Sequence, residues 1–395
     1  MGKKMRRLLS AVLSVTLAAS TMVSIPFSAK AAGKTIDIDF SQTDGAMIPK
    51  TGWLLMPNEN IPDGRIIPLN TKDVRDDIDT QNLLGNNGNG NSEGQLQDVL
   101  PNERNRLARI KHGKERLDEL GVDNYYPIMG YMPSWISSNG MPQGTPKDYA
   151  LWKQWVKDIV QYMKDNEVGV TEYNVWNENW AISVDNFNRM YEQAWWAGRE
   201  VMPDSKMIGP SPYTDMAGPI QSLADYCEQV GIPVDIVSWH FGNYNNIPNF
   251  QQGLEDYISQ KPALGNPEYY YEEYTSSGDV GKLNIEFTTL ANFDRADIDA
   301  AIRGIWTYVN GLSDQLITKQ LEENPYARRN IWWLMTAYGA MSGTRVKQSG
   351  DDLYVASYDE EKGEAKILIG NQSGDVTLNL NNLPFAGKNV RIDKY

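Results

Sequence analysis

Short apolar runs alternate with helical patterns through the middle of the chain. A run at 125–131 is followed by a segment in which Trp152, Trp155 and Ile159 recur at helical spacing and define one apolar face. Thr145 precedes this segment as a capping residue, with Pro146 suited to the first turn. Repetition of a strand followed by a helix predicts a parallel α/β fold.

Six such runs can be counted from residue 125 onward. Two more must lie upstream to give the eight strands of a (β/α)8 TIM barrel, and 52–55 and 71–75 are the candidates. The predicted strands are 52–55, 71–75, 125–131, 171–176, 206–210, 234–240, 268–273 and 300–306. Helical patterns follow at 184–201, 220–230, 250–259, 282–293 and 331–341. A Gly- and Asn-rich stretch at 84–94 predicts a loop, which either lines the substrate cleft or is only a connection.

The pattern changes after Gly343. Four segments (353–357, 365–369, 376–380 and 390–392) alternate apolar and polar residues, which predicts a small antiparallel β module. We therefore expect a catalytic barrel at 32–343 and a β-sandwich-like module at 344–395. The module is short for a sandwich, so either residues 34–40, which alternate in the same way, add a strand to it, or the module is truncated.

The first 31 residues have the layout of a secretory signal. Four of the first seven residues are Lys or Arg, 8–23 are mostly small and apolar, and Ala29-Lys30-Ala31 offers small residues at the cleavage positions. Ser and Thr interrupt the apolar run, which is also short for a membrane anchor. We therefore expect a signal peptide at 1–31 and a secreted protein.

Charge and composition limit the kinds of molecule that the protein is expected to bind. Residues 1–31 hold five of the 37 Lys and Arg and none of the 51 Asp and Glu, so the remainder has a net charge of −19. Such a surface repels nucleic acid and anionic membranes and suits a neutral substrate. Cys227 is the only cysteine and His112 and His240 are the only histidines, so no His/Cys zinc site and no cofactor are expected. The oligomeric state stays open.

Two carboxylates stand at predicted strand ends. Glu178 follows the strand at 171–176, and Glu273 ends the strand at 268–273. In a barrel of this kind, residues at the carboxyl ends of the strands face one shared bowl. A protonated acid can donate to a leaving oxygen there while an ionised one attacks the anomeric carbon of a sugar.

These residues also carry a resemblance to a known family. Val-Trp-Asn-Glu at 175–178 resembles the acid/base motif of clan A glycoside hydrolases, and Glu-Tyr-Thr-Ser-Ser at 273–277 resembles their nucleophile motif. The chain is most similar to glycoside hydrolase family 39, the β-xylosidase-like group, over about 120–345. The resemblance implies a retaining glycoside hydrolase with Glu178 as acid/base and Glu273 as nucleophile.

Two features depart from the clan pattern. The clan has Pro after the acid/base, where this chain has Asn179. Two adjacent acids, Glu272 and Glu273, stand at the nucleophile position, and strand alternation predicts that only one faces the bowl. We choose Glu273 because an aromatic residue follows it directly. Glu286 is a third candidate, rejected because its segment predicts a helix.

The substrate-binding residues are predicted from the same strand ends. Asn177 can hydrogen-bond a sugar 2-hydroxyl. Arg75 either holds the nucleophile ionised or forms a surface ion pair, and His240 either faces the bowl or packs in the core. In the clan a tyrosine in this region hydrogen-bonds the nucleophile, and the resemblance implies the same role for Tyr244. The aromatic and polar residues predicted to contact sugar are Trp135, Trp180, Trp306 and Asn310, and Trp176 adds stacking surface. For Trp306 the alternative is a side chain that plugs the barrel interior.

Two classes of function compete. The first is a secreted enzyme that cleaves neutral, plant-type oligo- or polysaccharides, either as a β-xylosidase-like enzyme or as an endo-acting glycanase or arabinofuranosidase of the same clan. The second is a secreted carbohydrate-binding protein that kept the barrel and lost the chemistry. The presence of both acids together with Asn177 favours the enzyme.

Overall fold

The computed structural model describes most of the chain between residues 34 and 393. The described residues are 24–26, 34–54, 61–77, 107, 110–133, 135–178, 181–276, 278–279, 281–304, 316–317, 323–385 and 389–393. They fall into two compact units, one formed by Met1–Pro49 with Ala340–Tyr395 and the other by Lys50–Gly339. Each unit therefore has its own core.

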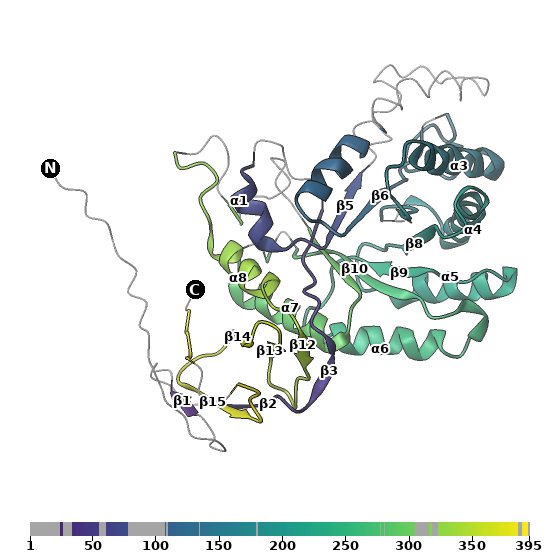
Figure 1. The fold of residues 1–395 in the computed structure, drawn as a ribbon. Coiled ribbons are helices and arrows are strands. Elements are labelled where there is room, and N and C mark those ends of the chain that lie inside the picture. The colour runs from purple at the N-terminus through teal and green to yellow at the C-terminus, as the bar shows by residue number, and fades with distance from the viewer. Residues whose placement is uncertain are drawn as a thin grey trace. The chain divides into compact units, whose positions relative to one another are not determined.

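The unit at 50–339 is a closed barrel of eight parallel strands (Figure 1). In chain order the strands are β4 (Gly52–Leu54), β5 (Asp73–Asp77), β6 (Asn124–Ile128), β7 (Glu172–Asn174), β8 (Lys206–Pro210), β9 (Ile236–Trp239), β10 (Glu268–Tyr274) and β11 (Ala300–Arg303). Strand β11 pairs with β4 and closes the ring, where Gly52 is required because a Cβ there would lie 2.3 Å from the Ala301 carbonyl oxygen. All eight predicted strands are present, which confirms the (β/α)8 fold.

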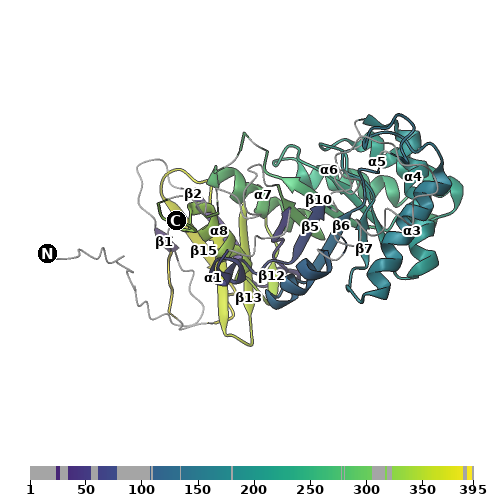
Figure 2. The same ribbon diagram turned by 90° about the horizontal axis from the view of Figure 1, so that it is seen from above.

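Helices cover the outside of this barrel, each beside the next along the chain (Figures 1 and 2). They are α3 (Tyr149–Asp165), α4 (Val184–Val201), α5 (Ala217–Val230), α6 (Ile247–Ile258), α7 (Leu283–Ala296) and α8 (Asn330–Gly339), with a further helix at 110–119 and the short α1 (Asp63–Ile66). Within the described ranges, no helix combines the length and the apolar character needed to cross a bilayer.

Helix α3 begins later in the chain than its sequence pattern predicts. The predicted cap, Thr145, is wrong: Asp148 is the N-cap, and its side chain accepts a hydrogen bond from the Ala150 backbone. Pro146 pairs with Ser137 in a β-bridge, so the chain is still extended at this point and the helix begins only after Asp148. The predicted apolar face, which includes Trp152 and Trp155, is buried.

Side chains fill the barrel interior, so it is a packed core rather than a channel. The central cluster consists of Tyr126, Ile208, Ile236, Tyr270, Ala300 and Ile302, all of them buried. Any substrate must therefore bind at an end of the barrel, and the loops that follow the carboxyl ends of the strands form the end that carries chemistry in this fold.

The amino ends of the strands carry a group of acids. Asp73, Glu172 and Glu268 begin β5, β7 and β10, and we call them the basal acid group. Lys206 Nζ binds both glutamates, and the Tyr270 hydroxyl donates to Glu172 at 2.8 Å and to Glu268 at 3.0 Å. These contacts link the acids of β7 and β10 to Lys206 of β8 and, through Tyr270, to each other, although β7 and β10 are not adjacent in the barrel.

The unit formed by the two chain ends contains two sheets. The first is antiparallel, with the order β14-β13-β12-β3, and consists of β3 (Thr43–Ala46), β12 (Thr344–Val346), β13 (Tyr354–Asp359) and β14 (Glu364–Ile369). The second has the order β1-β15-β2 and consists of β1 (Ser24–Pro26), β2 (Lys34–Asp39) and β15 (Val376–Asn381). The buried core includes Ile36, Ile38, Tyr354 and Leu378.

The early strand at 34–40 does join this module, as β2. It pairs with β15 in a parallel register, with Ile36 opposite Leu378, whereas β1 pairs with β15 in the antiparallel sense. A parallel partner is possible because β2 comes from the other end of the chain and needs no tight turn to reach β15. In the predicted strand at 390–392, only Val390 forms a β-bridge.

Candidate active site

Three residues at strand ends leave the extended conformation and point their side chains into one region. Glu178, Ser211 and Glu273 have φ angles of 48°, 51° and 52°. Left-handed backbone is uncommon for residues other than glycine and is concentrated at functional sites. The Glu178 amide donates to the Ser211 carbonyl at 3.2 Å, so the turns after β7 and β8 hold each other.

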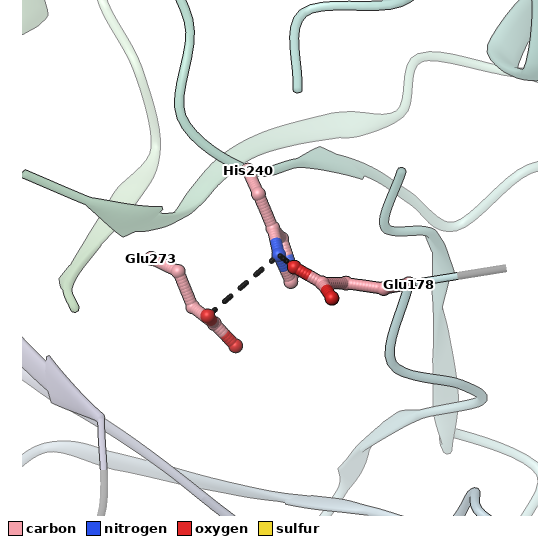
Figure 3. Close-up of side chains that lie close together, drawn as sticks. All are labelled: Glu178, His240 and Glu273. Atoms are coloured by element: carbon pink, nitrogen blue, oxygen red, sulfur yellow. Dashed lines mark hydrogen bonds and ion pairs between the residues drawn. The ribbon is translucent and has the colours of Figure 1, made fainter. Parts of the chain in front are cut away.

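The two predicted catalytic acids meet at His240. Its Nδ1 lies 3.2 Å from Glu178 Oε1 and 3.8 Å from Glu273 Oε2. Figure 3 shows the imidazole between the two carboxylates, which approach it from opposite sides. One oxygen of each acid and a ring nitrogen all lie within 4.8 Å of one another. Residues 95 positions apart in sequence thus share one small site, and His240 belongs to it rather than to a separate core cluster.

Arg75 connects the base of this site. Its guanidinium, which is fully buried, forms an ion pair with Glu273 and donates from Nη2 to Asn177 Oδ1 at 2.9 Å. Burial opposes the charged form of Arg75, but Glu272 and Glu273 outweigh it, so the pKa of Arg75 is raised above its ordinary value. The ion pair is internal, so Arg75 is a cation held against Glu273 and not part of a surface ion pair.

Glu272 corrects the prediction that only one of the adjacent acids faces inward. Its side chain is fully buried and lies 3.1 Å from Arg75 Nε, so Glu272 and Glu273 reach the same guanidinium. The register of β10 against β11 shifts between Tyr271 and Tyr274, and such a bulge interrupts the alternation of side chains. The prediction failed because it assumed a regular strand.

A buried hydrogen-bond network surrounds Glu272. Asn174 Nδ2 donates to it at 2.6 Å and Ser211 Oγ at 2.8 Å, and Ser211 in turn lies 2.7 Å from Ser238 Oγ. The sequence analysis missed these residues. Their signal was a polar residue within an otherwise apolar strand, at Asn174 in β7 and Ser238 in β9, because a polar side chain in a barrel interior requires a partner.

Glu178 differs from Glu273 in its surroundings. Its side chain is 21% exposed, against 7% for Glu273. When Nδ1 of His240 carries a hydrogen, its hydrogen bond to the carboxylate lowers the pKa of Glu178 below the ordinary value, while burial works in the opposite direction. The protonation of Glu178 therefore depends on which nitrogen of His240 carries the hydrogen.

The remaining predicted residues have different positions. Asn177 is held by Arg75, and its Nδ2 lies 3.5 Å from the Tyr131 hydroxyl. Trp135 is buried, and its indole nitrogen has no hydrogen-bond partner among the described residues. The Tyr244 carbonyl accepts from Asn292 at 2.7 Å, and within the described part of the chain the Tyr244 hydroxyl makes no hydrogen bond to Glu273. The predicted residues Trp180, Trp306 and Asn310 lie outside the described residues.

The contacts of Trp176 and Glu286 decide whether these two candidates take part in the site. Trp176 is 1% exposed and packs edge-on against Tyr131 and Trp152, so it supports the site from below and offers no stacking surface. Glu286 lies in α7, as its helical pattern predicted, and forms a buried ion pair with Arg303 at 2.9 Å. The rejection of Glu286 as a nucleophile thus agrees with its partner.

The cluster of Glu178, His240 and Glu273 has a spacing that a metal ion could bridge. Arg75, however, already supplies a cation in direct contact with Glu273. A dication beside this guanidinium would be repelled strongly at a buried position. The donor set therefore suits proton transfer and charge pairing better than metal binding.

Solved structures define the fold class to which this site belongs. A protein from Neocallimastix frontalis has a TM-score of 0.67 at 18% identity and covers 89% of this chain and 85% of its own. A glucosidase from Croceicoccus marinus has a TM-score of 0.61 at 15% identity, covering 87% and 79%. A GH39 β-xylosidase from Caulobacter crescentus has a TM-score of 0.56 at 14% identity, covering 89% and 84%. At these identities the likeness establishes the fold.

Two sequence comparisons add information about the family. Residues 137–261 match the family described as Glycosyl hydrolases family 39, which confirms the resemblance to that family for this segment. The segment contains Glu178 and His240, while Glu273 lies beyond it. A β-xylosidase from Caldicellulosiruptor saccharolyticus is 30% identical over 105 residues, or 24% of this chain. The aligned part spans about a fifth, 21%, of that protein's length.

Proposed function

We propose that the protein is a secreted, retaining glycoside hydrolase that cleaves O-glycosidic bonds of neutral, plant-type oligo- or polysaccharides in the manner of a β-xylosidase. One observation carries the proposal. Carboxylates from the ends of β7 and β10 approach within 4.8 Å around His240, and Arg75 binds one of them. The match to family 39 and the β-xylosidase relative support the same class.

The separation of the carboxylates supports retention. Inverting enzymes hold their two carboxyl groups about 6.5–9.5 Å apart to admit a water molecule, whereas retaining enzymes hold them about 5–5.5 Å apart. Glu178 and Glu273 present oxygens within 4.8 Å of each other, which is closer to the retaining than to the inverting separation.

The roles follow from the surroundings of each acid. Glu273, paired with Arg75, attacks the anomeric carbon while Glu178 gives its proton to the leaving oxygen, which forms a glycosyl–enzyme ester and releases the first product. Glu178 then takes a proton from water, and the oxygen of that water attacks the anomeric carbon and frees Glu273. Arg75 fixes the amide of Asn177, so that its Nδ2 can bind the sugar 2-hydroxyl.

The substrate proposal rests on charge and on relatives. A net charge of −19 without residues 1–31 disfavours acidic polymers. The β-xylosidase relative favours a xyloside over other neutral glycosides. An endo-acting glycanase or an arabinofuranosidase of the same clan is the second candidate, since the same acids serve either substrate.

Export is part of the proposal. Cleavage after residue 31 would remove β1, which pairs with β15, and would leave β15 paired with β2. The module would thus keep a sheet of two strands on that side. Mass spectrometry of the protein recovered from culture medium tests this, because an N-terminus near residue 32 is the expected result.

A panel of aryl glycosides tests the reaction itself. We expect hydrolysis of an aryl β-D-xyloside in which ¹H NMR first detects the β-anomer of xylose, since two displacements restore the starting configuration. The matched control is the double variant Glu178→Ala/Glu273→Ala, which reveals contaminating activity. First appearance of the α-anomer contradicts the retaining mechanism. Sugar binding without hydrolysis of any glycoside or polysaccharide identifies a carbohydrate-binding protein.

A further inference from the structure

Glu272 is a buried acid to which the proposed reaction gives no role. Two groups donate hydrogen bonds to it, Asn174 Nδ2 at 2.6 Å and Ser211 Oγ at 2.8 Å, and Arg75 Nε lies 3.1 Å away in an ion pair. Its side chain is fully buried. Donors on several sides of an acceptor-only group form the environment that an ionised carboxylate needs. A negative charge is therefore fixed beneath the two catalytic acids.

His240 connects Glu272 with Glu178. Its Nε2 lies 3.8 Å from Glu272 Oε2, and its Nδ1 lies 3.2 Å from Glu178 Oε1. The ring is fully buried, and Nε2 has no hydrogen-bond partner at standard distance among the described residues. Glu273 also faces Nδ1, at 3.8 Å, and Arg75 binds Glu272 and Glu273. These four groups are the charged neighbours of the imidazole.

A neutral imidazole carries one hydrogen, so each of its two forms leaves one nitrogen as an acceptor. With the hydrogen on Nδ1, His240 donates to Glu178, and the Nε2 lone pair faces the Glu272 carboxylate in the barrel interior. With the hydrogen on Nε2, the Nε2–H group faces Glu272, and Nδ1 becomes an acceptor toward Glu178. Electrostatic preference is strongest where the dielectric is lowest, which is at Glu272 rather than at the partly exposed Glu178.

We propose that Glu272 is a positioning residue that holds the hydrogen of His240 on Nε2, so that Nδ1 accepts the hydrogen of the Glu178 carboxylic acid. The assignment of Glu178 as the proton donor rests on the proposed function, whereas the form of the His240 ring does not. Catalytic hydrogen bonds are often long in unliganded active sites, so the 3.8 Å distance is compatible with an Nε2–H group directed at Glu272 Oε2.

The arrangement solves a problem of the proposed reaction. A proton donor must be protonated before the glycosidic bond breaks, but a hydrogen bond donated by His240 lowers the pKa of Glu178 and favours its ionised form. An acceptor nitrogen in the same place has the opposite effect, because its lone pair opposes a carboxylate and stabilises the acid. Glu272 thereby raises the fraction of enzyme that is ready to donate.

The form of the ring can be measured directly by ¹⁵N NMR of the full chain labelled at histidine. The chain has only two histidines, and a His112→Gln variant at the exposed second position assigns the signals of His240. We expect a single hydrogen on the His240 ring, carried by Nε2, at the pH at which the enzyme is active. A hydrogen on Nδ1, or a doubly protonated ring, overturns the proposal.

A matched pair of variants tests the cause. In Glu272→Gln an amide oxygen in the place of Oε1 keeps the donor of Asn174 and the contact with Arg75. The NH₂ group then takes the place of Oε2, where it faces Nε2 and can donate to the Ser211 hydroxyl, so the hydrogen of His240 should move to Nδ1. Ser211→Ala removes one hydrogen bond but keeps the charge of Glu272, so the hydrogen should stay on Nε2. An unchanged ring in Glu272→Gln overturns the proposal. The wild-type spectrum decides it even if this variant does not fold.

Kinetics supply the second readout. In Glu272→Gln the alkaline limb of kcat/KM, which reports the proton of Glu178, should move about one pH unit lower, a shift typical of one lost or reversed hydrogen bond. A merely structural role for Glu272 would reduce activity equally at every pH, and that result contradicts the proposal. If no glycoside is hydrolysed at all, the proposed function fails, while the NMR result still decides the role of Glu272.

Discussion

Acidic side chains gather at both ends of the barrel, and β7 and β10 supply members of each group. The basal acid group contains Asp73, Glu172 and Glu268. The rim acid group, which we define as Glu178, Glu272 and Glu273, lies at or beyond the carboxyl ends of the strands. Both groups come from similar segments, yet their partners and their backbone conformations differ.

Backbone and partners separate the two groups. Basal acids lie within regular strands. Glu172 and Glu268 are bound by the Lys206 ammonium, whose side chain is 37% exposed, and by the Tyr270 hydroxyl, and Asp73 accepts from the Asn124 amide. At the rim, Glu178 and Glu273 have positive φ angles and both contact the fully buried His240, while the buried Arg75 binds Glu273. A left-handed residue turns its side chain out of the sheet, where it can meet a ligand, whereas a residue within the strand remains part of the barrel wall.

The pKa shifts run in opposite directions. Burial raises the pKa of Asp73 to about 7 and also raises that of Glu172. At the rim, the hydrogen bond from His240 lowers the pKa of Glu178 when Nδ1 carries the hydrogen. The comparison teaches that an acid at a strand end becomes useful for catalysis when charged partners control its proton. Burial alone makes it a structural group.

The sharpest test of the comparison uses one strand. Glu273→Gly should reduce hydrolysis on the order of 10⁴-fold or more, because it removes the nucleophile of a group that acts as a unit. Glu268→Gln, at the other end of β10, is the matched control and should keep kcat within about threefold, since it lies at the opposite face of the barrel. Steady-state kinetics on the aryl xyloside measure both. Equal losses in the two variants contradict the division into rim and base.

Glu178→Ala should lower activity by about 10²–10⁴-fold, the usual contribution of a general acid/base. Sodium azide should restore part of the rate on a substrate with an activated leaving group and yield a β-glycosyl azide, because the small anion enters the space of the lost carboxylate. The control is Glu172→Gln at the start of β7. Failure of azide to rescue Glu178→Ala, combined with full activity of the variant, would show that Glu178 is not the acid/base.

The charged partners of the two groups should differ in their effect on stability. Arg75→Met leaves Glu272 and Glu273 buried without a cation, which should lower the free energy of unfolding by about 3–5 kcal/mol. Lys206→Met should cost less, about 1 kcal/mol, because its side chain is 37% exposed and water can replace it. Urea unfolding at pH 7 measures both values. A larger loss for Lys206→Met reverses the predicted order.

Asp73 predicts a pH dependence with a defined sign. Its pKa is about 7 in the folded protein, against 3.8 for an ordinary aspartate in water, so between these values only the unfolded chain is ionised, and stability falls as pH rises. Asp73→Asn should remove this slope and gain about 2–4 kcal/mol at pH 8, with no gain below about pH 4. The Asn124 amide can still donate to the new side chain. Unfolding curves at pH 4, 6 and 8 check this, and a gain at pH 4 argues for a cause other than ionisation.

Much of the fold was predictable because strands and helices leave a local periodic pattern. Six barrel strands and the helices from α3 to α8 were recognised from apolar spacing, including the α7 segment that excluded Glu286. The two upstream strands, β4 and β5, were placed because a closed barrel needs eight. The start of α3 was missed, because the bridge between Ser137 and Pro146 involves residues that no helical pattern links. The parallel pairing of β2 with β15 was also beyond a local pattern, since it joins the two ends of the chain.

The candidate site, like the fold, was predictable only in part. Glu178, Glu273, Arg75 and His240 were each found from their place at a strand end. The distances between these residues depend on how distant strands pack. The contact of both Glu272 and Glu273 with Arg75 depends on the bulge in β10. Strand alternation alone gave the opposite expectation, because a one-residue irregularity changes the face of every side chain that follows it.

The order of residues by itself determined the barrel, the β character of the segment after Gly343 and the two acids at strand ends, because short-range dihedral preferences and apolar spacing act within a few residues. Only the tertiary structure decided that Glu272 joins the site, that His240 stands between Glu178 and Glu273, and that Asp73 has a raised pKa. Those properties depend on burial and on charges brought together from distant strands, and neither is encoded in any single segment.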